Sequence, residues 1–181
     1  AWAAGDSVLL RRGQDGVWSD VPYGSLAPIR ALLPVPGGGL LGFGDDGLVI
    51  AVEAGIATPV LPFATGEDLL AAANVAGLVV VVGTGGAAFV GDWIGNLAPI
   101  PVPTWVDLRA VIGPGDDTVL AGGTRGSLFR FADGAWAPVV VPGFTGEVAT
   151  LVPGRDGSVL ALSADAVAVG PFLDIATFSR P

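Results

Sequence analysis

The 181-residue chain contains no cysteine, no histidine and no methionine, and only one tyrosine. Without cysteine the chain has no disulfide framework and no thiolate nucleophile. Without histidine it lacks the commonest general base and the commonest metal ligand. The serine–histidine and cysteine–histidine classes of nucleophilic catalysis are therefore excluded.

Charge is also scarce, and it is mostly of one sign. Seventeen acidic residues stand against eight basic ones, all of which are arginine, so the net charge is −9. Affinity for phosphate groups comes from clustered lysine and arginine, so we expect no nucleic-acid partner and no docking on anionic lipid. Because 51% of the residues are hydrophobic, we interpret the acidity as a means of keeping the chain soluble.

Glycine and proline are abundant, at 29 and 15 residues, and predict many turns. The turn residues recur at equivalent positions along the chain. GDSVLLRRGQDGVW (residues 5–18) and GTRGSLFRFADGAW (residues 123–136) share a first glycine and a final Asp-Gly-X-Trp. Equivalent positions occur at spacings of 39 or 40 residues, namely Gly5, Gly44, Gly83, Gly123 and Ser163. Self-similarity at a fixed period is the signature of a repeat architecture.

Each repeat contains up to four apolar runs separated by Gly, Pro or Asp, which is the pattern of short β-strands. Four strands in about 40 residues is typical of a β-propeller blade. We therefore predict an all-β fold, a β-propeller of about five four-stranded blades in a single domain. The blade units are residues 1–28, 29–68, 69–107, 108–147 and 148–181.

The N-terminal blade is predicted to lack its first strand. Five repeat positions are present, but first strands are found only at residues 29–35, 69–75, 108–112 and 148–152. In the fifth unit the last strand is poorly marked, and Ala176 stands where Trp18 and Trp136 stand in theirs. Since unpaired sheet edges are normally covered, we expect more chain, or another copy, to complete the ring.

The stretch of residues 69–91 carries no charge and is long enough to cross a bilayer as a helix. In the repeat register, however, it is the first strand, a turn, the second strand and the start of the third strand of one blade. Five glycines in the stretch favour the strands. We therefore predict a buried core segment and no membrane span. Residues 66–77, a weak helix candidate, likewise fall at a first-strand position.

The segment GTRGSLFRFADGAWAPV resembles the Gly-X-X-Gly, strand, Asp-Gly, Trp signature of BNR-like propeller repeats. These repeats are shared by sialidase-type propellers and photosystem II assembly-factor propellers. The resemblance is strong in two of the five units, and the Asp-box proper is not matched; kelch repeats, usually longer, rank second. The resemblance implies a propeller fold and a role as a recognition scaffold, and it carries over no active site.

Candidate residues fall into a structural and a binding group. The repeat positions are interpreted as structural, with the tryptophans packing between blades: Gly5, Gly44, Gly83, Gly123, Trp18 and Trp136. Trp105, Tyr23 and Phe144 lie in equivalent linkers and are candidates for an aromatic contact set, because aromatic residues are favoured interface anchors. The alternative is that these three seal adjacent blades. The aspartate pairs 45–46 and 116–117 lack the spacing of a calcium loop, so we predict no metal and no cofactor.

These observations predict a non-enzymatic scaffold that binds a protein or another ligand through its inter-blade loops. Hydrolysis of the sialidase type needs a tyrosine paired with a glutamate and an arginine cluster, and Tyr23 has no glutamate nearby in sequence. Two alternatives remain open: a structural subunit that polymerises into a surface assembly, and a glycan-binding or sialidase-like propeller. Because the sequence does not begin with methionine, we expect export to an extracellular or bacterial periplasmic location.

Overall fold

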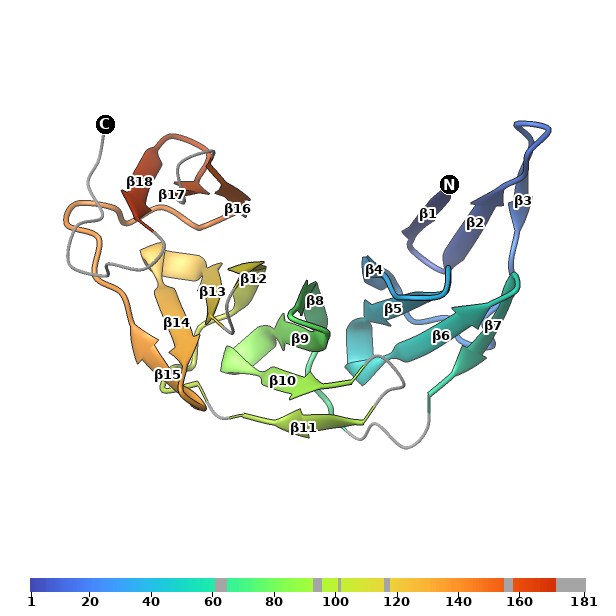
Figure 1. Cartoon of the computed structure of the whole chain (residues 1–181), viewed down its shortest axis with the longest axis horizontal. Helices are drawn as coiled ribbons and strands as arrows, with labels where there is room; N and C mark the ends of the chain where they lie inside the picture. Colours follow the sequence, from blue (N-terminus) through green and yellow to red (C-terminus); the bar gives the residue numbers. More distant parts are fainter. Residues whose placement is uncertain (61–64, 93–95, 101, 116–117, 155–157, 172–181) are drawn as a thin grey trace.

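The protein forms a row of five antiparallel β-sheets arranged along an arc (Figure 1). The computed structural model describes residues 1–60, 65–92, 96–100, 102–115, 118–154 and 158–171. Within these residues the helical elements are three one-turn 3₁₀ helices, η1 (Asp45–Gly47), η2 (Thr84–Gly86) and η3 (Thr124–Gly126). The prediction of an all-β fold is confirmed.

The strands follow the chain order within every sheet, and each sheet is a simple meander. The first sheet holds β1 (Trp2–Gly5), β2 (Val8–Arg12) and β3 (Trp18–Asp20). The second holds β4 (Ile29–Pro34), β5 (Leu40–Gly44), β6 (Val49–Glu53) and β7 (Ile56–Pro59). The third holds β8 (Leu69–Val75), β9 (Leu78–Gly83), β10 (Ala88–Gly91) and β11 (Leu97–Pro99). The fourth holds β12 (Leu108–Gly115), β13 (Thr118–Gly123), β14 (Leu128–Ala132) and β15 (Ala135–Pro138). The fifth holds β16 (Thr150–Pro153), β17 (Ser158–Leu162) and β18 (Val167–Pro171).

The apolar stretch of residues 69–91 is part of the third sheet. It forms β8, β9, η2 and β10, with valines 79 to 82 fully buried in β9. Strands covered on both faces carry continuous apolar runs, which explains the hydropathy of this segment. In the described part of the chain no helix is both long and apolar enough to cross a membrane.

In the described part of the chain the core consists of four hydrophobic clusters, each between two consecutive sheets. Alternate residues of one strand enter different clusters: in β5, Leu40 packs toward the first sheet and Leu41 toward the third. Figure 1 shows β4, β8, β12 and β16 along the inner side of the arc, and β7, β11 and β15 along its outer side. Among the described residues no core cluster joins the fifth sheet to the first, so this part of the arc is open.

The repeated glycine at the end of the second strand is required by a close backbone approach. At three of the repeats a Cβ atom would collide with the carbonyl oxygen of the residue that precedes the innermost strand: Gly44 with Pro28, Gly83 with Asp68, and Gly123 with Asp107. The amide of the next residue donates a hydrogen bond of 3.0 Å to the same oxygen: Asp45 to Pro28, Thr84 to Asp68, and Thr124 to Asp107. These glycines therefore let the second strand and the incoming chain pack backbone to backbone.

The second glycine of the Gly-X-X-Gly motif closes the 3₁₀ turn. Gly47, Gly86 and Gly126 have φ values of 68°, 78° and 67°, a region that favours glycine. A Cβ atom at these positions would also press on the linker that leads to the next sheet, at Thr65, Thr104 and Phe144 respectively. Each motif therefore ties one sheet to the linker that follows it.

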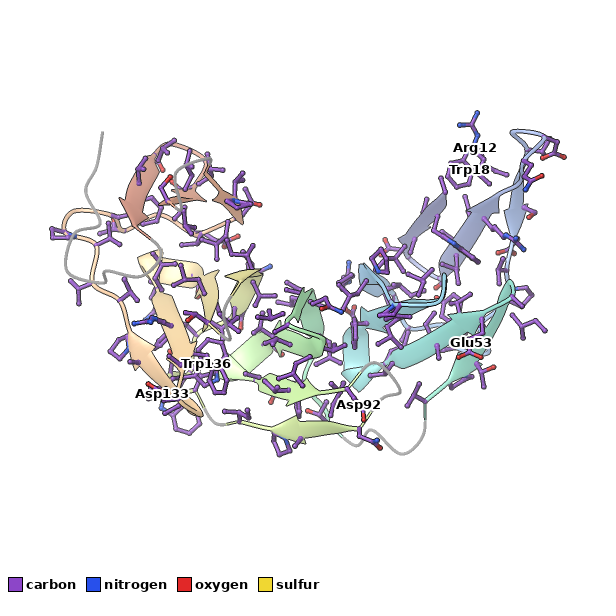
Figure 2. The ribbon with its side chains drawn as sticks, in the orientation of Figure 1. Arg12, Trp18, Glu53, Asp92, Asp133 and Trp136 are labelled. Atoms are coloured by element: carbon purple, nitrogen blue, oxygen red, sulfur yellow. The ribbon has the colours of Figure 1, made fainter. Side chains whose placement is uncertain are left out.

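The two repeat tryptophans lie in different environments (Figure 2). Trp136 is 7% exposed, lies in the cluster between the third and fourth sheets, and has its ring 5.2 Å from that of Phe131. Trp18 is 45% exposed and is paired across the sheet with Arg12. The packing interpretation therefore describes Trp136, whereas Trp18 stands on a face of the first sheet that no described sheet covers.

Candidate functional site

The linkers between sheets share a local turn that places one residue at a tip. In three of them a hydroxyl accepts a hydrogen bond from the amide two residues on: Ser25 from Ala27 at 3.0 Å, Thr65 from Glu67 at 3.1 Å, and Thr104 from Val106 at 3.2 Å. This is the Ser/Thr turn, in which a side-chain oxygen replaces a backbone carbonyl. The residues at the middle of these turns are Leu26, Gly66 and Trp105.

Leu26 and Trp105 are the most exposed of the large hydrophobic residues that the structure describes, at 84% and 94%. Each stands three residues before the innermost strand of the next sheet, so the two side chains occupy the same repeat position two sheets apart. In both linkers the turn holds the tip residue away from the hydrophobic core. Exposed apolar residues at a fixed repeat position are the feature expected of a contact surface.

We call this surface the linker face, and define it by residues 21–28, 65–68, 102–107 and 139–147 together with η1, η2 and η3. It contains a pocket of about 510 Å³ between the first linker and η1, lined by Leu26, Asp46 and Val60 among others. A second pocket of about 360 Å³ lies on the other side of the same linker, lined by Ser7, Tyr23 and Leu26 among others. Leu26 lines both pockets. The first linker therefore lies between the two pockets.

Of the three aromatic residues predicted as a contact set, only Trp105 is exposed. Tyr23 is 4% exposed, and its hydroxyl donates a hydrogen bond of 2.9 Å to the carbonyl of Ala27. Burial, with a smaller effect from the nearby Asp20, raises the pKa of the Tyr23 phenol. Phe144 is 5% exposed in the cluster between the fourth and fifth sheets. Tyr23 and Phe144 therefore seal adjacent sheets, and the binding role of Trp105 stays a prediction.

Leu26 was missed by the sequence reasoning because only aromatic linker residues were considered. The signal was present: Ser25, Thr65 and Thr104 all stand four residues before an innermost strand, so the residue after each of them is a turn tip. Aligning the linkers on the strand that follows them pairs Leu26 with Trp105.

The charged groups of the linker face hold the sheets together. Arg30 donates two hydrogen bonds to Asp45, at 2.7 and 2.6 Å, and its guanidinium also lies 3.5 Å from the carboxylate of Asp6 in the first sheet. The hydrogen bond from Arg30 lowers the pKa of Asp45, and the same pair raises the pKa of Arg30. Through its contact with Asp6, Arg30 therefore bridges the first and second sheets.

Further along the arc, carboxylates just before one sheet accept hydrogen bonds from backbone amides in the 3₁₀ turn of the preceding sheet. Asp68 accepts from the Asp46 amide at 3.1 Å and Asp107 from the Gly85 amide at 3.2 Å. The hydroxyl of Thr84 donates to Glu67 at 2.7 Å and accepts from the Asp68 amide at 3.0 Å, so it belongs to the same inter-sheet network. Arg109 lies 3.1 Å from Asp107 and 3.6 Å from Glu147. These carboxylates are all engaged in contacts within the protein, so we interpret them as structural.

The described residues contain no group of three or more carboxylates that could hold a metal ion. Of the two aspartate pairs considered from the sequence, Asp45 is engaged by Arg30, and residues 116–117 lie outside the described residues. The linker face therefore combines exposed apolar residues at turn tips, two pockets and several carboxylates.

Comparison with known proteins identifies the fold. No family model and no curated protein matches the sequence. Among solved structures, the virginiamycin B lyase of Staphylococcus aureus superimposes with a TM-score of 0.79 over 93% of this chain, at 9% identity. The WD40 β-propeller domain of Doa1 gives a TM-score of 0.77 over 99% of this chain, at 12% identity. YCF48 bound to D1 peptide gives 0.67 over 87% of this chain, at 13% identity.

These similarities show that the chain has a β-propeller fold, as predicted. They do not distinguish BNR-like repeats from other propeller repeats. This chain spans 64% of the length of the lyase and of the Doa1 domain, and 53% of YCF48.

Proposed function

We propose that this protein is a non-enzymatic β-propeller scaffold, built from BNR-like repeats, that binds a protein partner through its linker face. The observation that carries the proposal is the exposure of Leu26 and Trp105 at equivalent turn tips. A leucine and a tryptophan held by rigid turns supply contact area at little cost in conformational entropy. The pockets beside Leu26 provide concave surface for side chains of the partner.

One of the solved structures supports peptide binding, and another raises the alternative of an enzymatic activity. YCF48 was solved with a D1 peptide bound, so a propeller of this shape accepts a peptide. The lyase is named for an enzymatic activity, but at 9% identity it contributes the fold alone. The absence of histidine and cysteine from this sequence favours binding over catalysis.

The charge of the linker face indicates what kind of partner suits it. Asp46, Glu67 and Glu147 are exposed there, against one exposed arginine of this face, Arg125 in η3. At its margin Asp6 is exposed as well, and Arg30 and Arg109 already face carboxylates. A surface of this sign attracts basic segments and repels nucleic acid. We therefore propose a polypeptide partner with lysine or arginine beside its apolar anchors.

The test is selection of peptides against the purified chain from a random-peptide phage library. Binding of the selected peptides is then measured by isothermal titration calorimetry to the wild type, Leu26→Ser and Trp105→Ser. We expect a loss of about tenfold or more in affinity for at least one tip variant, the size typical of an anchor residue. The matched control is Ile56→Ser, because Ile56 is 70% exposed on β7, away from the linker face. Peptides that tolerate both tip variants but lose affinity for Ile56→Ser contradict the proposal.

We also propose that the five sheets are consecutive blades of a larger ring, with the innermost strand absent from the first blade. The uncovered length of the matched propellers supports this, as does the three-stranded first sheet.

A second candidate function, a subunit that assembles through its end blades, is favoured by the exposed face of the first sheet, where Trp18 lies. The two functions are separated by sedimentation velocity over a range of concentrations. An assembling subunit gains mass as its concentration rises, whereas a binding scaffold keeps the mass of one chain.

A further inference from the structure

A third pocket lies between the third and fourth sheets, at the ends of the strands opposite the linker face. Because each sheet is a meander, the linkers and 3₁₀ turns lie at one end of the strands, and the β8–β9 and β14–β15 turns lie at the other. The pocket has a volume of about 280 Å³ and is lined by β8, β9, β10, β13 and β14 and by the β14–β15 turn. Its walls are therefore two packed sheets.

The lining of this pocket changes from apolar at its floor to charged at its mouth. The floor consists of Val75, Val80 and Val119, each at most 3% exposed. The half-buried ring of Phe131 forms part of the wall. At the mouth are Leu78, which is 45% exposed, and Asp133, which is exposed in the β14–β15 turn (Figure 2). Asp133 is the one charged residue among the described residues that line the pocket.

The repeat explains why this interface is less completely filled than the preceding one. Between the second and third sheets, β5 contributes Leu41 and Phe43 to the core cluster. At the same distances from the repeat glycine, β9 contributes Val80 and Val82 to the cluster between the third and fourth sheets. Protein interiors are close-packed, so replacing a leucine and a phenylalanine by valines leaves volume that the backbone does not reclaim. Val80 lines that volume.

The carboxylate of Asp133 is not used by the fold. In the same Asp-Gly-X-Trp motif of the first sheet, Asp15 accepts a hydrogen bond of 3.0 Å from the Val17 amide. Within the described structure Asp133 makes no hydrogen bond and no ion pair. Arg130 does not neutralise it, because Arg130 lies on the face of β14 from which Leu128 packs toward the fifth sheet. Asp133 thus differs from the linker-face carboxylates, which hold the sheets together.

We propose that this pocket binds a small organic cation that has an aromatic or branched aliphatic body and one ammonium group. The body lies on the valine floor and against Phe131, and the ammonium group lies beside the carboxylate of Asp133. Ligand pockets typically combine an apolar lining with a few polar groups that fix the orientation of the ligand. An anion is repelled by Asp133, and a neutral ligand leaves the carboxylate without a partner.

The volume limits the size of the ligand. At roughly 30 Å³ of liquid volume for each non-hydrogen atom, the value for water, the pocket holds about nine such atoms. This is the size of an arylalkylamine and is far below that of a folded domain. The pocket and the linker face lie at opposite ends of the strands, so either proposal can fail without the other.

The test is a titration of the isotope-labelled chain with phenethylamine, followed through its backbone amide resonances by NMR. We expect saturable shifts that are largest at Leu78 and Gly134, with a Kd of about 0.1–1 mM, the range open to so small a ligand. Phenethyl alcohol, which has the same shape without the charge, should bind about threefold or more weakly, and phenylacetate should not bind. Added salt should weaken binding of the amine and leave that of the alcohol unchanged.

Two substitutions separate the charge from the apolar lining. Asp133→Asn keeps the size of the side chain, and asparagine tolerates the φ of 53° found there. It should lower the affinity for phenethylamine about threefold or more and leave that for phenethyl alcohol unchanged; the factor is modest because the carboxylate is exposed. Val80→Leu introduces the residue found at the equivalent Leu41 and should weaken both ligands by filling the pocket.

The matched control is Asp15→Asn, which makes the same charge change at the same motif position of the first sheet. It is expected to bind phenethylamine as the wild type does. Equal affinity of phenethylamine for Asp133→Asn and the wild type overturns the proposal, as do shifts centred on the linker face or no saturable shift below about 10 mM. Equal affinities for the amine and the alcohol also overturn it, because the pocket would then select no cation. If the spectrum of Val80→Leu shows an unfolded chain, the Asp133→Asn comparison and the three-ligand series decide the outcome.

Discussion

The first and fourth sheets carry the same repeat residues in different surroundings. Both have a glycine at the end of the second strand, Gly5 or Gly123, and both have a tryptophan on the last strand, Trp18 or Trp136. In the fourth sheet the glycine abuts the backbone of Asp107 and the tryptophan is buried against the third sheet. In the first sheet the glycine meets open space and the tryptophan is 45% exposed.

The difference shows that the repeat encodes interfaces rather than isolated sheets. Trp136 is paired with Phe131 on the neighbouring strand and packs against the third sheet. Trp18 is paired with Arg12, and no described sheet packs against it. The same sequence position therefore stabilises the protein only where a preceding blade covers it. This is the behaviour expected of an architecture whose stability is a sum of nearest-neighbour terms.

The largest expected effect of a matched pair of substitutions is at the repeated glycine. Gly123→Ala places a methyl group against the carbonyl of Asp107, between two backbone segments that cannot separate without breaking the hydrogen bond from Thr124. We expect a loss of at least about 3 kcal/mol in the free energy of unfolding, or no folded protein. Gly5→Ala is expected to stay within about 0.5 kcal/mol of the wild type. Urea unfolding followed by circular dichroism measures both.

Equal destabilisation by Gly5→Ala and Gly123→Ala contradicts the comparison, because it would mean that Gly5 already abuts a strand. Gly83→Ala serves as the positive control, since its Cβ atom would collide with the carbonyl of Asp68 in the same way.

The tryptophan pair is expected to show a smaller but clear difference. Trp136→Ala removes a buried ring from the interface between the third and fourth sheets and is expected to cost about 3–5 kcal/mol. Trp18→Ala removes a partly exposed ring and is expected to cost about 1 kcal/mol or less. Trp136→Phe should cost less than Trp136→Ala, because the indole N–H of Trp136 is buried without an acceptor in the described structure. Thermal unfolding at one protein concentration compares all three variants with the wild type, and a larger loss for Trp18→Ala than for Trp136→Ala would refute the asymmetry.

The sequence was sufficient for the parts of the fold that depend on local pattern. The first strands predicted at residues 29–35, 69–75 and 108–112 correspond to β4, β8 and β12, and the weak helix candidate at residues 66–77 contains strand β8 instead. The Asp-Gly turns were also predicted: Gly16 and Gly134 have φ values of 80° and 79°. Alternation of apolar residues with turn residues at a fixed period determines these features.

What the sequence did not predict depends on contacts between distant segments. Trp18 and Trp136 share the Asp-Gly-X-Trp motif, so the motif does not separate them, whereas the presence or absence of a neighbouring sheet does. Tyr23, Phe144 and Trp105 are all linker aromatics, but the direction in which each points is set by its place in the turn. Tyr23 lies two residues before the Ser25 turn and faces inward, whereas Trp105 is the tip residue of its turn. Linker composition alone does not distinguish these positions.

The smallest expected effect concerns the bridge between the first two sheets. Arg30 of the second sheet contacts both Asp45 of its own sheet and Asp6 of the first, whereas Arg109 of the fourth sheet contacts Glu147 on the way to the fifth. Asp45→Asn removes the charge that the Arg30 guanidinium holds in two hydrogen bonds. Exposed ion pairs contribute little because solvent and salt screen them, so we expect a small loss of stability at neutral pH that shrinks further in high salt.

The pH dependence of that loss identifies its cause. The hydrogen bond from Arg30 holds the pKa of Asp45 in the folded chain below its ordinary value. The ionised carboxylate therefore stabilises the folded chain fully above the ordinary pKa of aspartate, about 4, and this contribution disappears as the pH falls through the lowered value in the folded state. Urea midpoints of the wild type and Asp45→Asn should differ at pH 7 and converge as the pH approaches that lowered value. A difference that persists unchanged in acid would show that the amide introduced by Asp45→Asn disturbs packing, and that the loss of stability does not come from the Arg30–Asp45 charge pair.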